Sequence, residues 1–106
     1  MYFPLKANYK FSALGNELRL KVFRYVIEAE DAGRSAGDIA AHFKVPPSTL
    51  STHLRTLEQA GLLLSERDQQ RIIYRVNHIE LRKLIGFLVN DCCEGRPELC
   101  GLKIKS

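Results

Sequence analysis

The sequence predicts a mainly α (α+β) fold in a single domain, and three observations support this. The chain has 106 residues, 45% hydrophobic and 26% charged, which is a globular composition. Apolar residues recur at helical spacing in several segments, and two short segments near the middle have the character of strands. At this length, folding should bury about 65% of the surface of the unfolded chain. We therefore expect residues 1–106 to form one domain with one modest core, which excludes a large two-lobed enzyme.

The first segment with a clear helical period runs from about Asn16 to Ala29. Asn16 is a candidate N-cap, since its side-chain oxygen can accept a hydrogen bond from the first turn. The tripeptide Asp31-Ala32-Gly33 should break the helix. An N-terminal helix carrying aromatic residues is also expected, and its aromatic side chains are interpreted as dimer packing. These aromatic residues are Tyr2, Phe3, Tyr9 and Phe11.

A short helix at about residues 36–43 is predicted next, followed by a tight turn. The turn is forced by Val45-Pro46-Pro47, because the residue before a proline avoids helical backbone angles. Pro47 or Ser48 should open the following helix, with Ser48 as a candidate cap. The apolar residues that predict the short helix are Ile39, Ala40 and Phe43.

The helix predicted at about residues 48–60 has two contrasting faces. Its apolar face is formed by Leu50, Leu54 and Leu57, and Gly61 is a natural terminating residue. The opposite face carries small hydrogen-bonding side chains and an arginine instead of the usual Glu and Lys. Such a face suits contact with a nucleic-acid groove. Its members are Ser48, Thr49, Ser51, Thr52, Arg55 and Thr56, with His53 at the boundary.

Two strands are predicted after this helix, at about Leu62–Glu66 and Arg71–Val76. They should form a two-stranded hairpin, the wing, over about residues 62–76. Its polar tip would be Arg67-Asp68-Gln69-Gln70. The last helix should begin near residue 79 and carry a long apolar stripe, wider than a small core needs, that can also pack against a second copy. The stripe is Leu81, Leu84, Ile85, Leu88, Val89 and Cys92.

Two helices, a tight turn, a recognition-type helix and a basic hairpin make a winged helix-turn-helix. The sequence resembles the ArsR/SmtB family of bacterial metalloregulatory repressors over about residues 10–90. This resemblance implies double-stranded operator DNA as partner and a homodimer through the N- and C-terminal helices. The residues that carry the resemblance are Ala13–Leu20, Asp38–Ala40, Ser48–Leu54, Leu57, Ala60–Leu62 and Arg71–Val76.

The resemblance predicts how DNA would be bound. The recognition helix would enter the major groove, and the wing would approach the minor groove or the phosphates. His53 has two open interpretations, base contact or packing. Lys6, Lys10 and Arg19 are expected on a solvated face, with phosphate contact as the alternative. The predicted DNA-binding residues are Ser48, Thr49, Ser51, Thr52, His53, Arg55, Arg67, Gln69, Gln70 and Arg71.

The chain departs from many family members in its cysteines. The segment Arg34–Asp38, where arsenic and cadmium sensors carry a Cys-x-Cys pair, has no thiol. The paired Asp and His sites that zinc sensors carry on the last helix are also missing, since His78 at the start of that helix has no second histidine one turn later. The three cysteines instead lie at the end of the last apolar stripe and after it, at Cys92, Cys93 and Cys100. They resemble the C-terminal arsenite site of one branch of the family.

Three thiolates suit a soft, three-coordinate metalloid, so As(III) or Sb(III) is the expected inducer and Cys92, Cys93 and Cys100 the expected ligands. Methylated arsenicals, Pb(II) and Cd(II) remain open. The alternative function is a thiol redox or persulfide sensor that uses Cys93 and Cys100. A thiol enzyme is disfavoured, because no Cys-x5-Arg loop, Cys-x-x-Cys motif or nearby histidine base is present. The expected protein is a cytoplasmic, non-enzymatic repressor that leaves its operator when the inducer binds, with no organic cofactor and no membrane partner.

Overall fold

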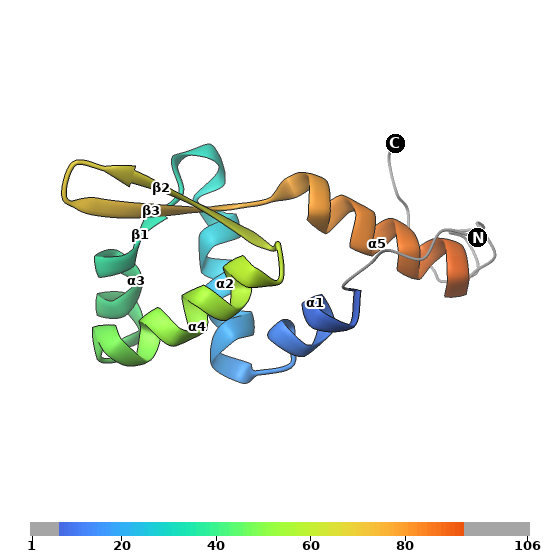
Figure 1. Ribbon diagram of the computed structural model, residues 1–106, viewed down its shortest axis with the longest axis horizontal. Helices are drawn as coiled ribbons and strands as arrows, with labels where there is room; N and C mark the ends of the chain where they lie inside the picture. The colour runs from blue at the N-terminus through green and yellow to red at the C-terminus, as the bar shows by residue number, and fades with distance from the viewer. Residues whose placement is uncertain (1–6, 93–106) are drawn as a thin grey trace.

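A computed structural model describes residues 7–92 of the chain (Figure 1). Within that range, no helix is both long and apolar enough to cross a membrane. The elements are α1 (Ala7–Leu14), α2 (Glu17–Glu28), a 3-10 helix η1 (Glu30–Ala32), β1 (Arg34–Ser35), α3 (Ala36–Phe43), α4 (Pro47–Gln59), β2 (Leu63–Asp68), β3 (Arg71–Val76) and α5 (His78–Cys92).

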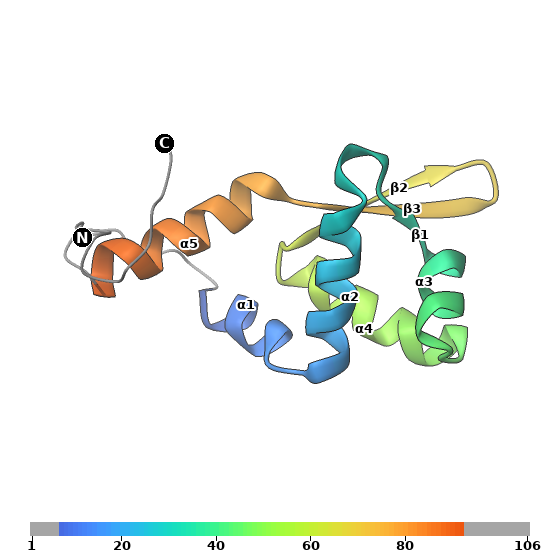
Figure 2. The ribbon, with the colours of Figure 1, turned by 180° about the vertical axis from the view of Figure 1, so that it is seen from behind.

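The elements form a helical layer beneath a small sheet, with α5 leading away from both (Figure 1). Seen from behind, α2 crosses in front of α4 (Figure 2). The core lies between these helices and one face of the sheet. Its fully buried side chains include Val22, Val26, Ile39, Leu50, Leu54, Leu57, Leu62 and Leu63. The predicted winged helix-turn-helix fold is confirmed.

Local sequence explains where most helices begin and end. The Asn16 side chain accepts a hydrogen bond from the backbone N–H of Arg19 and caps α2, as predicted. The Ser35 hydroxyl accepts one from the backbone N–H of Asp38 and caps α3. Gly61 follows the end of α4 with a φ of 83°, the left-handed conformation that glycine adopts at low cost.

The prediction that Ser48 caps the recognition helix is wrong. The N-cap of α4 is Pro46, which makes no side-chain cap bond, and Pro47 occupies the first turn. Proline suits this position because its ring presets the helical φ and because the N–H that it lacks would have no partner within the helix. Ser48 is therefore already inside the helix and exposed, and its hydroxyl remains available to a ligand.

The predicted two-stranded wing is part of a three-stranded antiparallel sheet of order β1-β3-β2. The third strand, β1, has only two residues, Arg34 and Ser35, paired with Tyr74 and Ile73. The hairpin is also longer than predicted, because Asp68 pairs with Arg71 and the turn shrinks to two residues. A two-residue strand has too little alternation to be seen in sequence.

The predicted stripe of α5 is divided between buried and exposed positions. Leu84 and Val89 are buried, whereas Ile85 and Leu88 are exposed. Near the start of α5, the Lys10 ammonium of α1 lies 3.3 Å from the Glu80 carboxylate, and the Lys10 side chain is only 5% exposed. Neither interpretation offered for Lys10, a solvated face or phosphate contact, is correct. Its role is to join α1 to α5.

Candidate DNA-binding surface

The exposed face of α4 is the first part of the candidate surface. Residues 48–55 of α4 present hydroxyl groups and one guanidinium to solvent, while Leu50, Leu54 and Leu57 hold the opposite face in the core. The Thr52 hydroxyl donates to the Ser48 carbonyl at 3.5 Å, so its oxygen can still accept. The predicted residues that lie exposed on this face are Ser48, Thr49, Ser51, Thr52 and Arg55.

His53 differs from its neighbours on α4, because it is half-buried and faces α2. Its Nδ1 lies 3.2 Å from Nη1 of Arg19. The same guanidinium donates to the Ala13 carbonyl at 2.8 Å and to the Ser12 carbonyl at 3.5 Å. Arg19 therefore joins the end of α1 to α4 and is not the solvated residue expected from sequence. Nothing in the sequence pattern pairs residues 19 and 53, so this contact could not be predicted.

The wing supplies the second part of the surface, with Arg67, Gln69, Gln70 and Arg71 all exposed at or beside its tip. Cross-strand partners share a face of a hairpin. Arg67 is opposite Ile72, and Ile72 lines a cavity of about 150 Å³ with residues of α3 and α4. Arg67 therefore emerges on the side of the wing that faces α4, whereas Arg71 emerges on the other side.

The acidic side chains near this surface form hydrogen bonds or ion pairs within the chain. Glu58 accepts a hydrogen bond from the Ser65 hydroxyl, and Glu66 is paired with Arg75 at 3.1 Å. The Arg71 guanidinium lies 3.9 Å from the Asp68 carboxylate. Within residues 7–92, Arg55 and Arg67 form no ion pair and keep their charge available for an anionic partner.

The position of Arg67 leads to a prediction about DNA affinity. Arg67→Gln should lower the slope of log affinity against log salt by about 0.9, the value for one lost phosphate contact. Arg71→Gln should change this slope by less than half as much, because Arg71 faces away from α4 and is already beside Asp68. Fluorescence anisotropy across a salt series measures both. Equal slopes for the two variants would contradict the assignment.

Tyr74 of β3 anchors the wing against α4. Burial raises the pKa of Tyr74 above its ordinary value of 10.0, the Glu58 carboxylate raises it further, and Arg55 opposes them. The folded protein thus keeps the phenol proton after the unfolded chain has begun to lose it.

Tyr74 should therefore make stability depend on alkaline pH. Its contribution is fully present below pH 10.0 and is lost as the pH rises through the higher folded-state pKa. Tyr74→Phe should reduce this alkaline loss of stability, as measured by urea unfolding at several pH values. An identical alkaline profile for wild type and Tyr74→Phe would contradict the prediction.

The end of α5 lies at the other end of the described molecule from the wing tip (Figure 1). Cys92 is the last residue of α5. Cys93 and Cys100 lie outside the described residues, so the structure does not test whether the three thiols meet. Residues 7–92 contain no cluster of three His, Cys, Asp or Glu side chains that could hold a metal ion.

Known proteins resemble this chain in both sequence and fold. Residues 14–66 match the family described as "Helix-turn-helix domain". The transcriptional repressor SdpR of Bacillus subtilis is 30% identical over 92 residues, which cover 87% of this chain and 99% of SdpR. The transcriptional activator HlyU of Vibrio cholerae is 27% identical, over 84% of this chain and 80% of HlyU.

The solved structures agree with these sequence matches. An ArsR-like transcriptional regulator from Rhodococcus sp. RHA1 has a TM-score of 0.73 and 26% identity, over 91% of this chain and 88% of that protein. The helix-turn-helix match covers half of the chain, and SdpR matches nearly its whole length. The chain therefore belongs to the ArsR family of helix-turn-helix, DNA-binding transcriptional regulators.

Proposed function

We propose that this regulator is a homodimeric repressor that leaves its operator when As(III) or Sb(III) binds to Cys92, Cys93 and Cys100. One observation supports the proposal above all: the candidate DNA-binding residues and the cysteines lie in separate parts of one short chain. The hydrogen-bonding face of α4 and the wing lie at one end, and every cysteine follows residue 91 at the end of α5. SdpR is a repressor and HlyU is an activator, so the two relatives differ in whether they lower or raise transcription. Repression by this chain is therefore part of what we propose.

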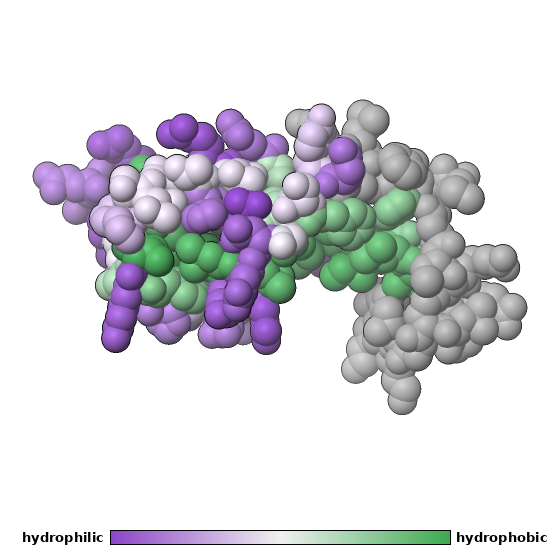
Figure 3. Space-filling view, turned by 90° about the horizontal axis from the view of Figure 1, so that it is seen from below, coloured by the Kyte–Doolittle hydropathy of each residue, from purple (hydrophilic) through white to green (hydrophobic). Residues whose placement is uncertain are grey.

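Exposed apolar side chains on α1 and α5 support the dimer. Tyr9 is 60% exposed on α1, and Ile79, Ile85 and Leu88 are between 43% and 66% exposed on α5. Hydrophobic residues gather over this part of the molecule (Figure 3). Such a patch marks an interaction site, and a second copy would place two recognition helices on two half-sites of DNA.

The position of the thiols implies that the inducer acts at a distance. Cys92, the first of the three proposed ligands, is the last residue of α5, and the end of α5 lies away from α4 (Figure 1), so we expect the inducer to change the arrangement of the two subunits through α5. Allosteric coupling of about 1–3 kcal/mol is typical and corresponds to about 5- to 150-fold weaker binding. Bound to three thiolates, As(III) would link the end of α5 to the residues that follow it.

The DNA-binding part of the proposal can be tested without knowing the operator. Duplexes selected by the protein from a random pool should contain two inverted half-sites, about one helical turn or a multiple of it apart. Size-exclusion chromatography with light scattering should show a dimer on the selected duplex. Selection of a single, non-repeated half-site by a monomer would contradict the dimer.

The inducer is tested on the same duplex in reducing buffer. Arsenite or antimonite should weaken binding of the wild type about 5- to 150-fold. Cys93→Ser and Cys100→Ser should each abolish this response without changing affinity in the absence of arsenite. Unchanged binding by the wild type with arsenite, or full release of Cys93→Ser, would refute the metalloid proposal.

A thiol redox or persulfide sensor that uses Cys93 and Cys100 is the second candidate. One of the similar structures, 27% identical to this chain, is that of reduced HlyU from Vibrio cholerae. The redox state of that relative was therefore worth stating, which makes a redox sensor the second hypothesis to test. Release by a mild oxidant or a persulfide, but not by arsenite in reducing buffer, would favour this function. Both serine variants should then be insensitive to the oxidant.

A further inference from the structure

The contact between Arg19 and His53 is the only described side-chain hydrogen bond that joins α2 to α4 within residues 7–92. Arg19 also donates to Ser12 and Ala13, whose carbonyls belong to the last turn of α1. The Ser12 carbonyl also accepts a hydrogen bond from the backbone N–H of Gly15 at 3.1 Å, and a cation is favourable at this end of the helix dipole. One guanidinium thus connects the end of α1 with the middle of α4.

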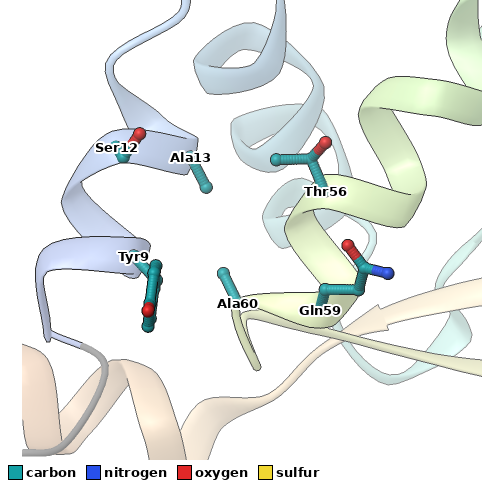
Figure 4. Close-up of a pocket in the computed structure, with 6 residues that line it drawn as sticks. All are labelled: Tyr9, Ser12, Ala13, Thr56, Gln59 and Ala60. Atoms are coloured by element: carbon teal, nitrogen blue, oxygen red, sulfur yellow. The ribbon is translucent and has the colours of Figure 1, made fainter.

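The packing between α1 and α4 is otherwise incomplete. A cavity of about 340 Å³ lies between them, lined by Tyr9, Ser12, Ala13, Thr56, Gln59 and Ala60 (Figure 4). This pocket is open to solvent and leaves part of the facing surfaces of α1 and α4 without close contact. The Arg19 contact, made at the carbonyls of two residues that line this pocket, therefore helps to set the angle of α4 relative to α1, together with the core packing of Leu50, Leu54 and Leu57.

The hydrogen bond also fixes the chemical state of His53. A guanidinium has only donors, so Nδ1 of His53 must be the acceptor. In a neutral ring that makes this contact, the proton is on Nε2. A protonated ring would place two cations 3.2 Å apart and would leave no acceptor.

We propose that Arg19 and His53 form a positioning pair that fixes the recognition helix α4 on the end of α1. The inference rests on the proposed homodimer, since α1 contributes to its apolar surface. The pair thereby transmits the arrangement of the subunits to the DNA-reading face. His53 acts through Nδ1 toward Arg19, and not through Nε2 toward a base.

Two replacements of His53 separate these roles. Asparagine places its amide at the position of Nδ1, whereas glutamine reaches the position of Nε2. His53→Asn should bind the selected duplex within about twofold of the wild type, and His53→Gln should lose about tenfold, within the range of coupled contacts. Good binding by His53→Gln with loss by His53→Asn would overturn the proposal.

Arg19 is tested with a matched control on the same helix. Arg19→Lys keeps the charge but cannot donate in three directions from a planar fork, so it should lose about tenfold in affinity. The double variant Arg19→Lys, His53→Gln should lose no more than either single variant, because both remove the same contact. Lys21→Gln removes an exposed cation, paired with Glu17, and should stay within about twofold. Additive losses in the double variant would overturn the proposal.

A measurement without DNA separates failure of this inference from failure of the proposed function. Long-range ¹H–¹⁵N NMR of the free protein should show His53 as the Nε2–H tautomer, and Arg19→Lys should shift its Nδ1 resonance. An Nδ1–H tautomer, or an unchanged Nδ1 resonance, would overturn the pair even if DNA is bound. Failure of the wild type to select any duplex would refute the repressor and leave this NMR result standing.

Discussion

Replacing Gly33 with alanine is expected to lower the free energy of unfolding by about 3 kcal/mol, because two separate penalties act there. Gly33 has φ 71° and ψ −172°, a conformation that is essentially restricted to glycine. A Cβ at this position would lie 2.6 Å from the Tyr74 carbonyl oxygen and 2.9 Å from Cγ2 of Ile73. The backbone of β3 would have to move to admit one methyl group.

Gly33→Ala should also disturb the wing, because Gly33 directly precedes β1, which pairs with β3. The pairing of Arg34 with Tyr74 and of Ser35 with Ile73 would be disturbed. The hydrogen bond from Arg75 to the Asp31 carbonyl, 2.8 Å long, would also be strained. We expect Gly33→Ala to weaken DNA binding as well, since Tyr74 holds the wing against α4.

Urea denaturation measures the effect, with Gly37→Ala as the matched control. Gly37 lies in the first turn of α3, and a Cβ there would meet nothing within 4 Å. Alanine should raise stability at this site by about 0.5–1 kcal/mol, because glycine is a poor helix former. Equal stability for Gly33→Ala and wild type would show that the loop can adopt another conformation.

Local signals predicted most of the helical framework. Asn16, Pro47 and Gly61 act over one turn of chain, and the apolar spacing of Leu50, Leu54 and Leu57 is a property of α4 alone. These features depend only on neighbours in sequence, so they can be inferred before any fold is known. The bounds predicted for α2, α3 and α4 agree with the structure to within one residue.

Long-range contacts account for what the sequence could not predict. Strand β1 exists only because Gly33 allows the chain to approach β3 some forty residues later. Lys10 and Arg19 were read as solvated cations because their partners, Glu80 and His53, lie on distant helices. The exposed face of α4 was predicted, whereas the contacts that orient it were not.

Substituting either partner of the ion pair between Lys10 and Glu80 should change the free energy of unfolding, but by different amounts. Glu80→Gln leaves the ammonium of Lys10 buried and unpaired, which costs about 3–5 kcal/mol in a fully buried pair. Because the Glu80 side chain is 32% exposed and water can partly compensate, we expect a loss of about 2 kcal/mol. Lys10→Met removes the charge and keeps the apolar stem, so it should be neutral or stabilising.

Urea unfolding of both variants and of the double variant tests this asymmetry. Glu17→Gln is the control, because its ion pair with Lys21 is exposed and should be worth less than about 1 kcal/mol. Lys10→Met should also rescue Glu80→Gln, since the unpaired charge is then absent. If instead Lys10→Met lowers the free energy of unfolding as much as Glu80→Gln does, the ion pair itself stabilises the fold. The loss in Glu80→Gln would then not come from leaving Lys10 buried without a partner.

The same ion pair bears on regulation, because it fastens α1 to the first turn of α5. The proposed inducer site includes Cys92, the last residue of α5, and the Arg19 contact lies at the end of α1. A displacement of α5 would therefore reach α4 through Glu80, Lys10, α1 and Arg19 in turn. Lys10→Met should retain DNA binding but reduce the loss of affinity that arsenite causes, by at least threefold if coupling follows this path. An undiminished response to arsenite in Lys10→Met would instead place the coupling in the contacts between subunits.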